Sequence, residues 1–136
     1  KWSAKEEVKL VEKNMSRPNG IVLSLDEKTA YVANSDPAND VIMAFDVLAD
    51  GFSNGRIFFD GNNLSKTREG LFDGLKMHSS GIIFATGPGG VLLLDSVGVH
   101  LGTIMPGKKT ANCSFDKDEQ YLYLTSTDVL ARVKLN

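Results

Sequence analysis

The feature that most constrains the fold is a short segment that occurs three times along the chain. Each copy opens with a short polar residue, continues as an apolar stretch, passes a polar turn and returns as a strand that contains an aromatic residue. The copies cover residues 17–23, 71–75 and 110–115. A strand–turn–strand unit that recurs at intervals of about forty to fifty residues is typical of the blades of a β-propeller.

The opening polar residues of the three copies are Asn19, Asp73 and Asn112, which precede the aromatic residue of the return strand by twelve, eleven and eleven positions. The blades of a propeller are arranged around an axis, so equivalent positions in successive blades converge on one central tunnel. We therefore expect these three side chains, far apart in the sequence, to be neighbours in space.

The composition is typical of a β-rich protein of single-domain size. Of the 136 residues, 42% are hydrophobic and 13 are glycine. The formal net charge of −2 disfavours nucleic acid as a partner, since nucleic acid binding needs clustered Lys and Arg. No apolar run approaches the roughly 18 residues of a membrane span, so no membrane partner is expected either. Because the chain opens on Lys1 and has no signal peptide, we expect it to start inside a longer gene or at a processed end.

The alternation of polar and apolar residues predicts the strands of each blade. Residues 7–12 alternate like a half-buried strand and are expected to end a partial blade over residues 1–18. Full blades are predicted over residues 19–72 and 73–111, and a further partial blade over 112–136. The strands predicted after the first are 21–25, 29–34, 41–46, 55–59, 74–77, 81–86, 90–95, 100–104, 114–116, 120–126 and 129–135.

Two full and two partial blades are too few to close a ring, because propellers typically have about four to eight blades. An open half-ring leaves unpaired strand edges and apolar blade faces in water. Each large apolar side chain left exposed forfeits about 1.5–3 kcal/mol, and several such losses exceed the typical domain stability of about 5–15 kcal/mol. We therefore expect the chain to be completed by a missing N-terminal half of the propeller or by a second chain.

Several runs of residues resemble the SMP-30/gluconolactonase/luciferin-regenerating-enzyme-like family, in particular its bacterial gluconolactonase-like members. They are RPNGIVLS at 17–24, FDGLK at 72–76, IFATGPGGV at 83–91 and KTANC at 109–113. The resemblance implies a six-bladed β-propeller of which this chain is the C-terminal half. It also implies a lactone hydrolase that acts on a sugar lactone with one divalent cation on the propeller axis, usually Ca²⁺, with Zn²⁺, Mg²⁺ or Mn²⁺ as alternatives.

The same resemblance implies roles for two of the polar residues. The Asn of the family's Pro-Asn-Gly motif matches Asn19, and the Asp of its Pro-Asp-Gly motif matches Asp73. Both are metal ligands in the family, and the aspartate is also its proposed general base. The family's third protein ligand, a glutamate, and its substrate-contacting Arg and Asn lie in the part that would precede Lys1. Phe72 stands where the family has proline, which puts the geometry of the loop around Asp73 in question.

The chemistry of these residues agrees with such a site. Ca²⁺ takes about six to eight oxygen ligands, of which Asn19 and Asp73 supply two, and the Asp73 carboxylate can accept a proton from an attacking water. The competing interpretation is structural, because Asn-Gly and Asp-Gly are the strongest hairpin-turn dipeptides. The alternative function is a non-catalytic propeller that binds a ligand or a protein, since a fold does not fix an activity.

Three further polar residues have a structural alternative. Asn112 either contacts the substrate or makes a structural hydrogen bond at the start of its strand, and the second interpretation is preferred. Asn34 and Asp36 follow a return strand and either approach the other end of the central tunnel or terminate the strand, and the second interpretation is preferred.

The remaining reactive residues are not expected to take part in chemistry. His78 and His100 are expected to be exposed in turns. Cys113 is expected to be a small core residue and not a nucleophile. The glycine-rich residues 87–90 lie between two predicted strands with no helix after them, so we expect a turn and not a phosphate-binding loop.

Overall fold

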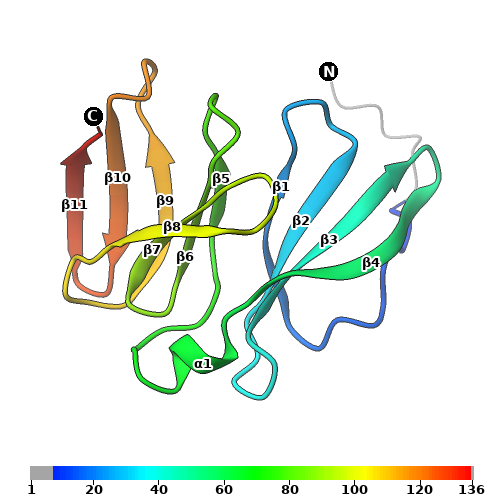
Figure 1. Ribbon diagram of the computed structural model, residues 1–136, viewed down its shortest axis with the longest axis horizontal. Coiled ribbons are helices and arrows are strands. Elements are labelled where there is room, and N and C mark those ends of the chain that lie inside the picture. Colours follow the sequence, from blue (N-terminus) through cyan, green and yellow to red (C-terminus); the bar gives the residue numbers. More distant parts are fainter. Residues whose placement is uncertain (1–7, 136) are drawn as a thin grey trace.

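The computed structural model describes residues 8–135 and contains three antiparallel sheets (Figure 1). The strand order is β1–β2–β3–β4 in the first sheet, β5–β6–β7–β8 in the second and β9–β10–β11 in the third. The strands are β1 Pro18–Leu23, β2 Thr29–Asn34, β3 Val41–Leu48, β4 Gly51–Asp60, β5 Leu75–Met77, β6 Ile83–Gly87, β7 Gly90–Leu94, β8 His100–Ile104, β9 Thr110–Phe115, β10 Tyr121–Ser126 and β11 Val129–Lys134. The prediction of an all-β chain is confirmed, apart from the one-turn helix α1, Asn62–Ser65.

The repeated segment is visible in the register of the first two strands of each sheet. The aromatic residue of the return strand pairs with Val22 in the first sheet, with Lys76 in the second and with Ser114 in the third. Residues 87–90 form the tight turn between β6 and β7, in which Gly87 pairs with Gly90. Gly89 in that turn has a φ of 90°, a conformation that glycine adopts without steric cost. The predicted turn is therefore confirmed.

Backbone hydrogen bonds join the inner strands of neighbouring sheets. The Gly20 N–H donates to the Asp73 carbonyl at 2.9 Å, and the Gly74 N–H donates to the Ala111 carbonyl at 3.0 Å. The Thr86 hydroxyl lies within hydrogen-bonding distance of the carbonyls of Gly74, at 3.1 Å, and Ala111, at 3.0 Å. The strand β1 consequently contacts β5, and β5 contacts β9, in a propeller-like arrangement of successive sheets.

Two apolar clusters fill the spaces between the sheets. Between the first and second sheets lie Tyr31, Ala33, Ile42, Ala44, Phe72, Leu75, Ile83, Ala85, Leu92 and Leu94. Between the second and third lie Phe84, Val91, Cys113, Leu122 and Leu124. Burial raises the pKa of the Cys113 thiol to about 11, so the nucleophilic thiolate is scarce at neutral pH. The prediction that Cys113 is a core residue is confirmed.

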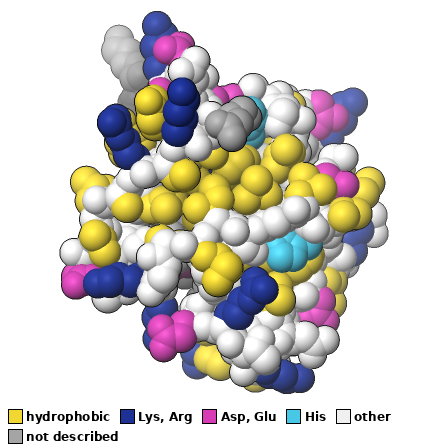
Figure 2. Space-filling view, turned by 60° about the vertical axis from the view of Figure 1, so that its left-hand side comes forward, with side chains coloured by type: hydrophobic (Ala, Val, Ile, Leu, Met, Phe, Trp, Pro, Cys, Tyr) yellow, Lys and Arg dark blue, Asp and Glu magenta, His cyan; other side chains and the backbone are white. Residues whose placement is uncertain are grey.

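The outer faces of the first and third sheets are less well covered. The strand β11 pairs with β10 alone among the described strands, and Leu130 in it is 77% exposed. Figure 2, turned so that the side of the molecule with β11 comes forward, shows a broad band of hydrophobic side chains. On the first sheet, Val11 and Met15 help to enclose an apolar hollow of about 220 Å³ against Ile21 and Phe45.

The first predicted strand is wrong in the part that the structure describes. Residues 8–12 form no strand, and residue 7 lies outside the described part. A strand needs a hydrogen-bonded neighbour, and the first sheet is formed by β1 to β4 without this segment. The helix α1 was not predicted because four residues are too few to show a helical period. No helix in the described part of the chain is long and apolar enough to cross a membrane.

Gly20 has no space for a side chain, which leads to a stability prediction. A Cβ built at Gly20 would lie 2.0 Å from the Asp73 carbonyl oxygen, which is backbone and cannot rotate away. We expect Gly20→Ala to lower the free energy of unfolding by about 1–3 kcal/mol or more, as overpacking of a close contact does. Denaturant unfolding measures the change.

Gly102 provides the matched control for this substitution. It also lies in a strand, β8, but a Cβ built there meets nothing within 4 Å. Gly102→Ala should therefore leave stability unchanged or raise it by up to about 1 kcal/mol, because alanine is favoured over glycine inside a strand. Equal unfolding curves for the two variants would show that the close approach at Gly20 is unimportant.

Candidate functional site

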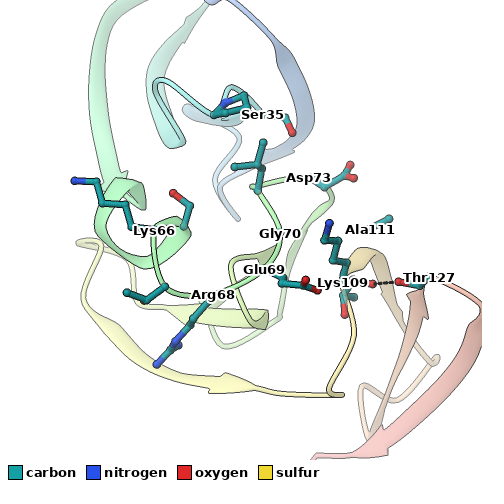
Figure 3. A pocket seen from close by; sticks show the side chains of 14 residues that line it. Ser35, Lys66, Arg68, Glu69, Gly70, Asp73, Lys109, Ala111 and Thr127 are labelled. Atoms are coloured by element: carbon teal, nitrogen blue, oxygen red, sulfur yellow. Dashed lines mark hydrogen bonds between the residues drawn. The ribbon is translucent and has the colours of Figure 1, made fainter.

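An open cleft of about 800 Å³ lies at the end of the molecule where the inner strands begin (Figure 3). Its walls are the turn after β2, with Ser35 and Pro37, the loop 65–71 and the segment 109–111. Asp73 lies on the wall between these loops, two residues before the start of β5. A cleft of this size is typical of small-molecule sites. The loop 65–71 and the segment 109–111 were not singled out from the sequence as cleft walls, because they have no periodic pattern.

Main-chain hydrogen bonds fix Asp73 on both sides. Its N–H donates to the Thr86 carbonyl at 3.0 Å, and its own carbonyl accepts from Gly20. Burial raises the pKa of the Asp73 carboxyl above its ordinary value, and the nearby Asn19 side chain opposes that rise. The structure therefore brings Asn19 and Asp73 together, although they are far apart in the sequence. Asn19 itself lines the apolar hollow beside β1 and not the cleft.

The third equivalent position is Ala111 and not Asn112, which corrects the repeat alignment. Gly20 donates to the carbonyl of Asp73, and Gly74 donates in the same way to that of Ala111. The physical reason is the length of the first hairpin turn in each sheet. The hydrogen bond that closes this turn encloses four residues between Ser24 and Thr29 and between Asp116 and Tyr121, but three between His78 and Ile82. The third sheet has the longer turn of the first sheet, so its equivalent position lies twelve residues before Tyr123, at Ala111, and the interval of eleven that fits the second sheet misplaces it by one residue.

Asn112 occupies the place that Gly20 and Gly74 have in the other sheets. Its Oδ1 accepts a hydrogen bond from the Cys113 N–H at 2.9 Å and from the Lys76 ammonium at 3.3 Å. A Cβ built at Gly74 would lie 2.3 Å from the same oxygen, which is too close for a side chain at that position. Asn112 is not among the residues that line the cleft. These contacts favour the structural interpretation, and a contact with substrate stays a prediction.

The donor atoms fit part of a site for a hard cation. Carboxylate and amide oxygens are the ligands that Ca²⁺ and Mg²⁺ prefer, and Asp73 and Asn19 provide one of each side by side. A cation there would offset the desolvation that raises the pKa of Asp73. Within residues 8–135, no three His, Cys, Asp or Glu residues form a metal-binding group. The assignment of Asn19 and Asp73 as metal ligands stays a prediction.

Charged side chains surround the cleft on several sides. In the view of Figure 3, Lys109 extends into the cleft on the side of Asp73, whereas Lys66 and Arg68 extend outward on the opposite side. Glu69 lies near Lys109 in the same view. The sequence motif that contains Lys109 was recognised, but its place on the cleft wall was not.

Asp40 is a buried acid beside the site that the sequence analysis did not single out. It is fully buried, and its Oδ1 accepts a hydrogen bond from the Phe72 N–H at 2.8 Å. Within the described chain its Oδ2 has no partner. Burial raises the pKa of the Asp40 carboxyl, the hydrogen bond from the Phe72 N–H opposes that rise, and the Asp60 charge raises the pKa further. The Phe72 N–H that Asp40 binds is the donor that a proline at this position would lack.

The two histidines are half-buried, so the expectation of exposed histidines is wrong. His78 packs edge-on against Phe115, with ring centroids 5.2 Å apart, and its Nε2 lies 3.4 Å from a Glu119 oxygen. His100 packs against Phe59 at 5.9 Å. The physical reason is that each imidazole ring covers an aromatic side chain that would otherwise be in water.

Asn34 has a structural role at the end of β2. It is 2% exposed, accepts a hydrogen bond from the Arg17 N–H at 2.9 Å and donates to the Asn39 carbonyl at 2.8 Å. Asp36 is exposed and accepts from the Ala38 N–H at 2.9 Å. The predicted role of both residues in terminating the strand is confirmed.

Comparisons with known proteins identify relatives of this chain. The family model described as SMP-30/Gluconolactonase/LRE-like region matches residues 1–128. The chain is 34% identical over 130 residues to a gluconolactonase of Zymomonas mobilis subsp. mobilis, an alignment that covers 92% of this chain and 36% of that protein. The chain thus spans little more than a third of the length of this relative.

Solved structures with a similar fold include a gluconolactonase as well. A gluconolactonase from Xanthomonas campestris superposes with a TM-score of 0.77 at 30% identity, over 88% of this chain and 38% of that one. A calcium-binding protein, regucalcin, from Agrobacterium tumefaciens superposes with a TM-score of 0.69 at 25% identity, over 85% and 39% of the two chains.

The burial of Asp40 leads to a prediction about pH. Its pKa in the folded protein is raised above the ordinary value of 3.8, so the fold favours the protonated acid. The contribution of this group to stability is greatest below pH 3.8 and declines as the pH rises through the raised pKa. Asp40→Asn has no charge to bury, so its free energy of unfolding relative to the wild type should increase over that pH range. Urea unfolding from pH 3 to pH 8 measures the difference, and a difference that is constant with pH would contradict the prediction.

Proposed function

The chain belongs to the SMP-30/gluconolactonase/LRE-like family, and we propose that it is the C-terminal half of a six-bladed propeller that hydrolyses a sugar lactone with a divalent cation. The observation that supports the proposal most directly is that Asn19 and Asp73 come together at the starts of two inner strands, where the Gly20 N–H donates to the Asp73 carbonyl at 2.9 Å. The gluconolactonase relatives suggest the substrate class, and the calcium-binding neighbour suggests Ca²⁺ as the cation.

In this proposal the three sheets are consecutive blades. The blades cover residues 19–72, 73–111 and 112–136, and residues 1–18 end the blade before them. The exposed Leu130 in β11, which pairs with β10 alone among the described strands, supports an incomplete ring, because a large apolar side chain at a sheet edge is a liability in water. The missing N-terminal half of the propeller, or a second chain, covers this edge in the complete protein.

Asn19 and Asp73 would each provide one oxygen ligand to the cation, and a glutamate upstream of this chain, as the family resemblance implies, would provide a third. A cation held there would supply Lewis-acid stabilisation of the charge on the lactone carbonyl oxygen. The oxygen-only donors favour Ca²⁺, Mg²⁺ or Mn²⁺ over Zn²⁺, which more often takes nitrogen and sulfur ligands.

Asp73 is the general base of the proposed reaction. Its carboxylate accepts a proton from water while the water oxygen adds to the lactone carbonyl carbon. The ring carbon–oxygen bond then breaks, the ring oxygen takes up a proton, and a hydroxy acid leaves. The burial that raises the pKa of Asp73 makes it a stronger base. That effect counteracts the adjacent cation, which lowers the pKa.

A substrate contact by Asn112 would use its amide nitrogen. The Asn112 Oδ1 already accepts from Cys113 and Lys76, so only the amide nitrogen can donate to a lactone hydroxyl group. Asn112 lies outside the cleft lining, so the structure supports this contact less than it supports the other parts of the proposal.

The first functional prediction concerns Asp73→Asn in the full-length protein. The carboxamide keeps the shape of the side chain and one metal-binding oxygen but cannot accept the proton. We expect kcat for gluconolactone hydrolysis to fall by about 10²–10⁴-fold, with the folded structure intact by circular dichroism. Asp118→Asn, an exposed aspartate in the turn after β9, is the matched control and should hydrolyse like the wild type. Near-normal turnover of Asp73→Asn at saturating calcium, corrected for spontaneous hydrolysis, would refute the base assignment.

The second functional prediction separates metal binding from proton transfer. Asn19→Ala removes a ligand but leaves the base, so its activity should require more calcium and recover in part when calcium is in excess. Hydrolysis rates measured across a calcium titration give the apparent affinity of each variant. If excess calcium rescued Asp73→Asn as well as Asn19→Ala, the two residues would not have the distinct roles proposed here.

A further inference from the structure

Asp40 makes three hydrogen bonds to the loop 61–72, which contains α1 and the part of the cleft wall formed by residues 65–71. The residue lies directly before β3 and is fully buried. Its N–H donates to the Asn62 Oδ1 at 2.9 Å, and its carbonyl accepts from the Gly61 N–H at 2.9 Å. Its carboxyl Oδ1 accepts from the Phe72 N–H at 2.8 Å. One residue therefore joins the beginning and the end of the loop 61–72.

The end of this loop leads directly into Asp73. The Phe72 ring is fully buried and packs edge-on against Phe59, with ring centroids 5.8 Å apart. Gly87 lies so close to that ring that a Cβ there would be 2.6 Å from it. The ring is thus fixed from several sides, and the orientation of the backbone that leaves it depends on its hydrogen bonds.

Two successive N–H groups have fixed acceptors at this point. The Phe72 N–H donates to Asp40, and the Asp73 N–H donates to the Thr86 carbonyl at 3.0 Å. Fixing consecutive peptide groups sets the direction in which the side chain of the second residue leaves the backbone. The carboxyl of Asp40 therefore acts on the direction of the Asp73 side chain without touching it.

Stability alone does not account for an acid at this position. The Asp40 Oδ2 has no partner within residues 8–135, and a buried polar atom without a hydrogen bond is destabilising. Local rules of this kind are most often broken where function requires it. The feature that Asp40 provides, and that an apolar residue would not, is an acceptor for the Phe72 N–H.

We propose that Asp40 is a positioning residue for Asp73, whose carboxyl holds the Phe72 N–H and so directs the Asp73 side chain into the cleft. The catalytic consequence rests on the proposed role of Asp73 as general base. The hydrogen bond and its effect on the backbone at residues 72 and 73 do not depend on that role, so the two parts can be tested separately.

The experiment uses the full-length protein with Asp40→Ala, Asp40→Asn and a control, Asn63→Ala. The amide of Asp40→Asn retains an oxygen acceptor for the Phe72 N–H, whereas alanine does not. Asn63 lies in α1 at the beginning of the same loop, is exposed, and accepts a hydrogen bond from the Lys66 ammonium at 3.4 Å. Asp40→Thr, which leaves a smaller cavity than alanine but cannot reach the N–H, replaces Asp40→Ala if the alanine variant does not fold.

Two measurements are made on each variant. Hydrogen–deuterium exchange of the amides at residues 71–74 should become about ten- to a hundredfold faster in Asp40→Ala, because the Phe72 N–H loses its acceptor. The kcat for gluconolactone should fall about ten- to a hundredfold, as misplacement of a catalytic group does, with little change in KM. Asp40→Asn should restore both values to near those of the wild type, and Asn63→Ala should change neither.

Each outcome decides one part of the proposal. Unchanged exchange at residues 71–74 in Asp40→Ala would overturn the inference, and so would faster exchange with unchanged kcat. Equal loss in Asp40→Asn would show that the residue acts through its charge or volume and not as an acceptor. A wild-type protein without lactone hydrolysis would refute the proposed function, while the exchange data would still decide whether Asp40 holds the loop.

Discussion

The architecture depends on a backbone hydrogen bond that is made twice between inner strands. Gly20 donates to Asp73 and Gly74 donates to Ala111, and each bond fixes the distance between two neighbouring sheets. The donor must be free of a side chain in the first case, because the acceptor carbonyl lies where a Cβ would be. The apolar clusters between the sheets then fill a space whose width these bonds set. The position of the candidate site follows from the same bonds, since Asp73 is itself one of the bonded residues.

Two opposing effects act on the pKa of the Asp73 carboxyl, and their balance suits the role that we propose for it, a base beside a cation. Burial raises its pKa, and the amide of Asn19 lowers it. A fully exposed carboxylate would be too weak a base next to a positive charge, whereas a fully buried one without a donor would remain protonated. The half-buried position at the start of a strand, with a neutral amide as neighbour, lies between these limits.

The sequence was sufficient to predict what depends on local pattern. Alternation located most of the strands, and the aromatic return strands revealed the repeat. It was insufficient where the structure depends on the length of a turn, as in the misplacement of Asn112 by the shorter turn at His78–Ile82. The contact between Asp40 and Phe72 joins residues 32 positions apart and leaves no trace in any periodic pattern. The histidines were assigned to solvent because the aromatic rings beneath them come from distant strands.

The connection between neighbouring sheets is main chain to main chain, which has a consequence for how such proteins diverge. The residue whose carbonyl accepts the bond can be an aspartate, as at Asp73, or an alanine, as at Ala111, without any change in the bond. The side chain at this position can therefore change in evolution while the hydrogen bond between the sheets is kept. After a blade is duplicated, one copy can lose its polar side chain and the other can keep it, while the ring retains its geometry. Selection can thus reshape the axial ligand set of a propeller one blade at a time.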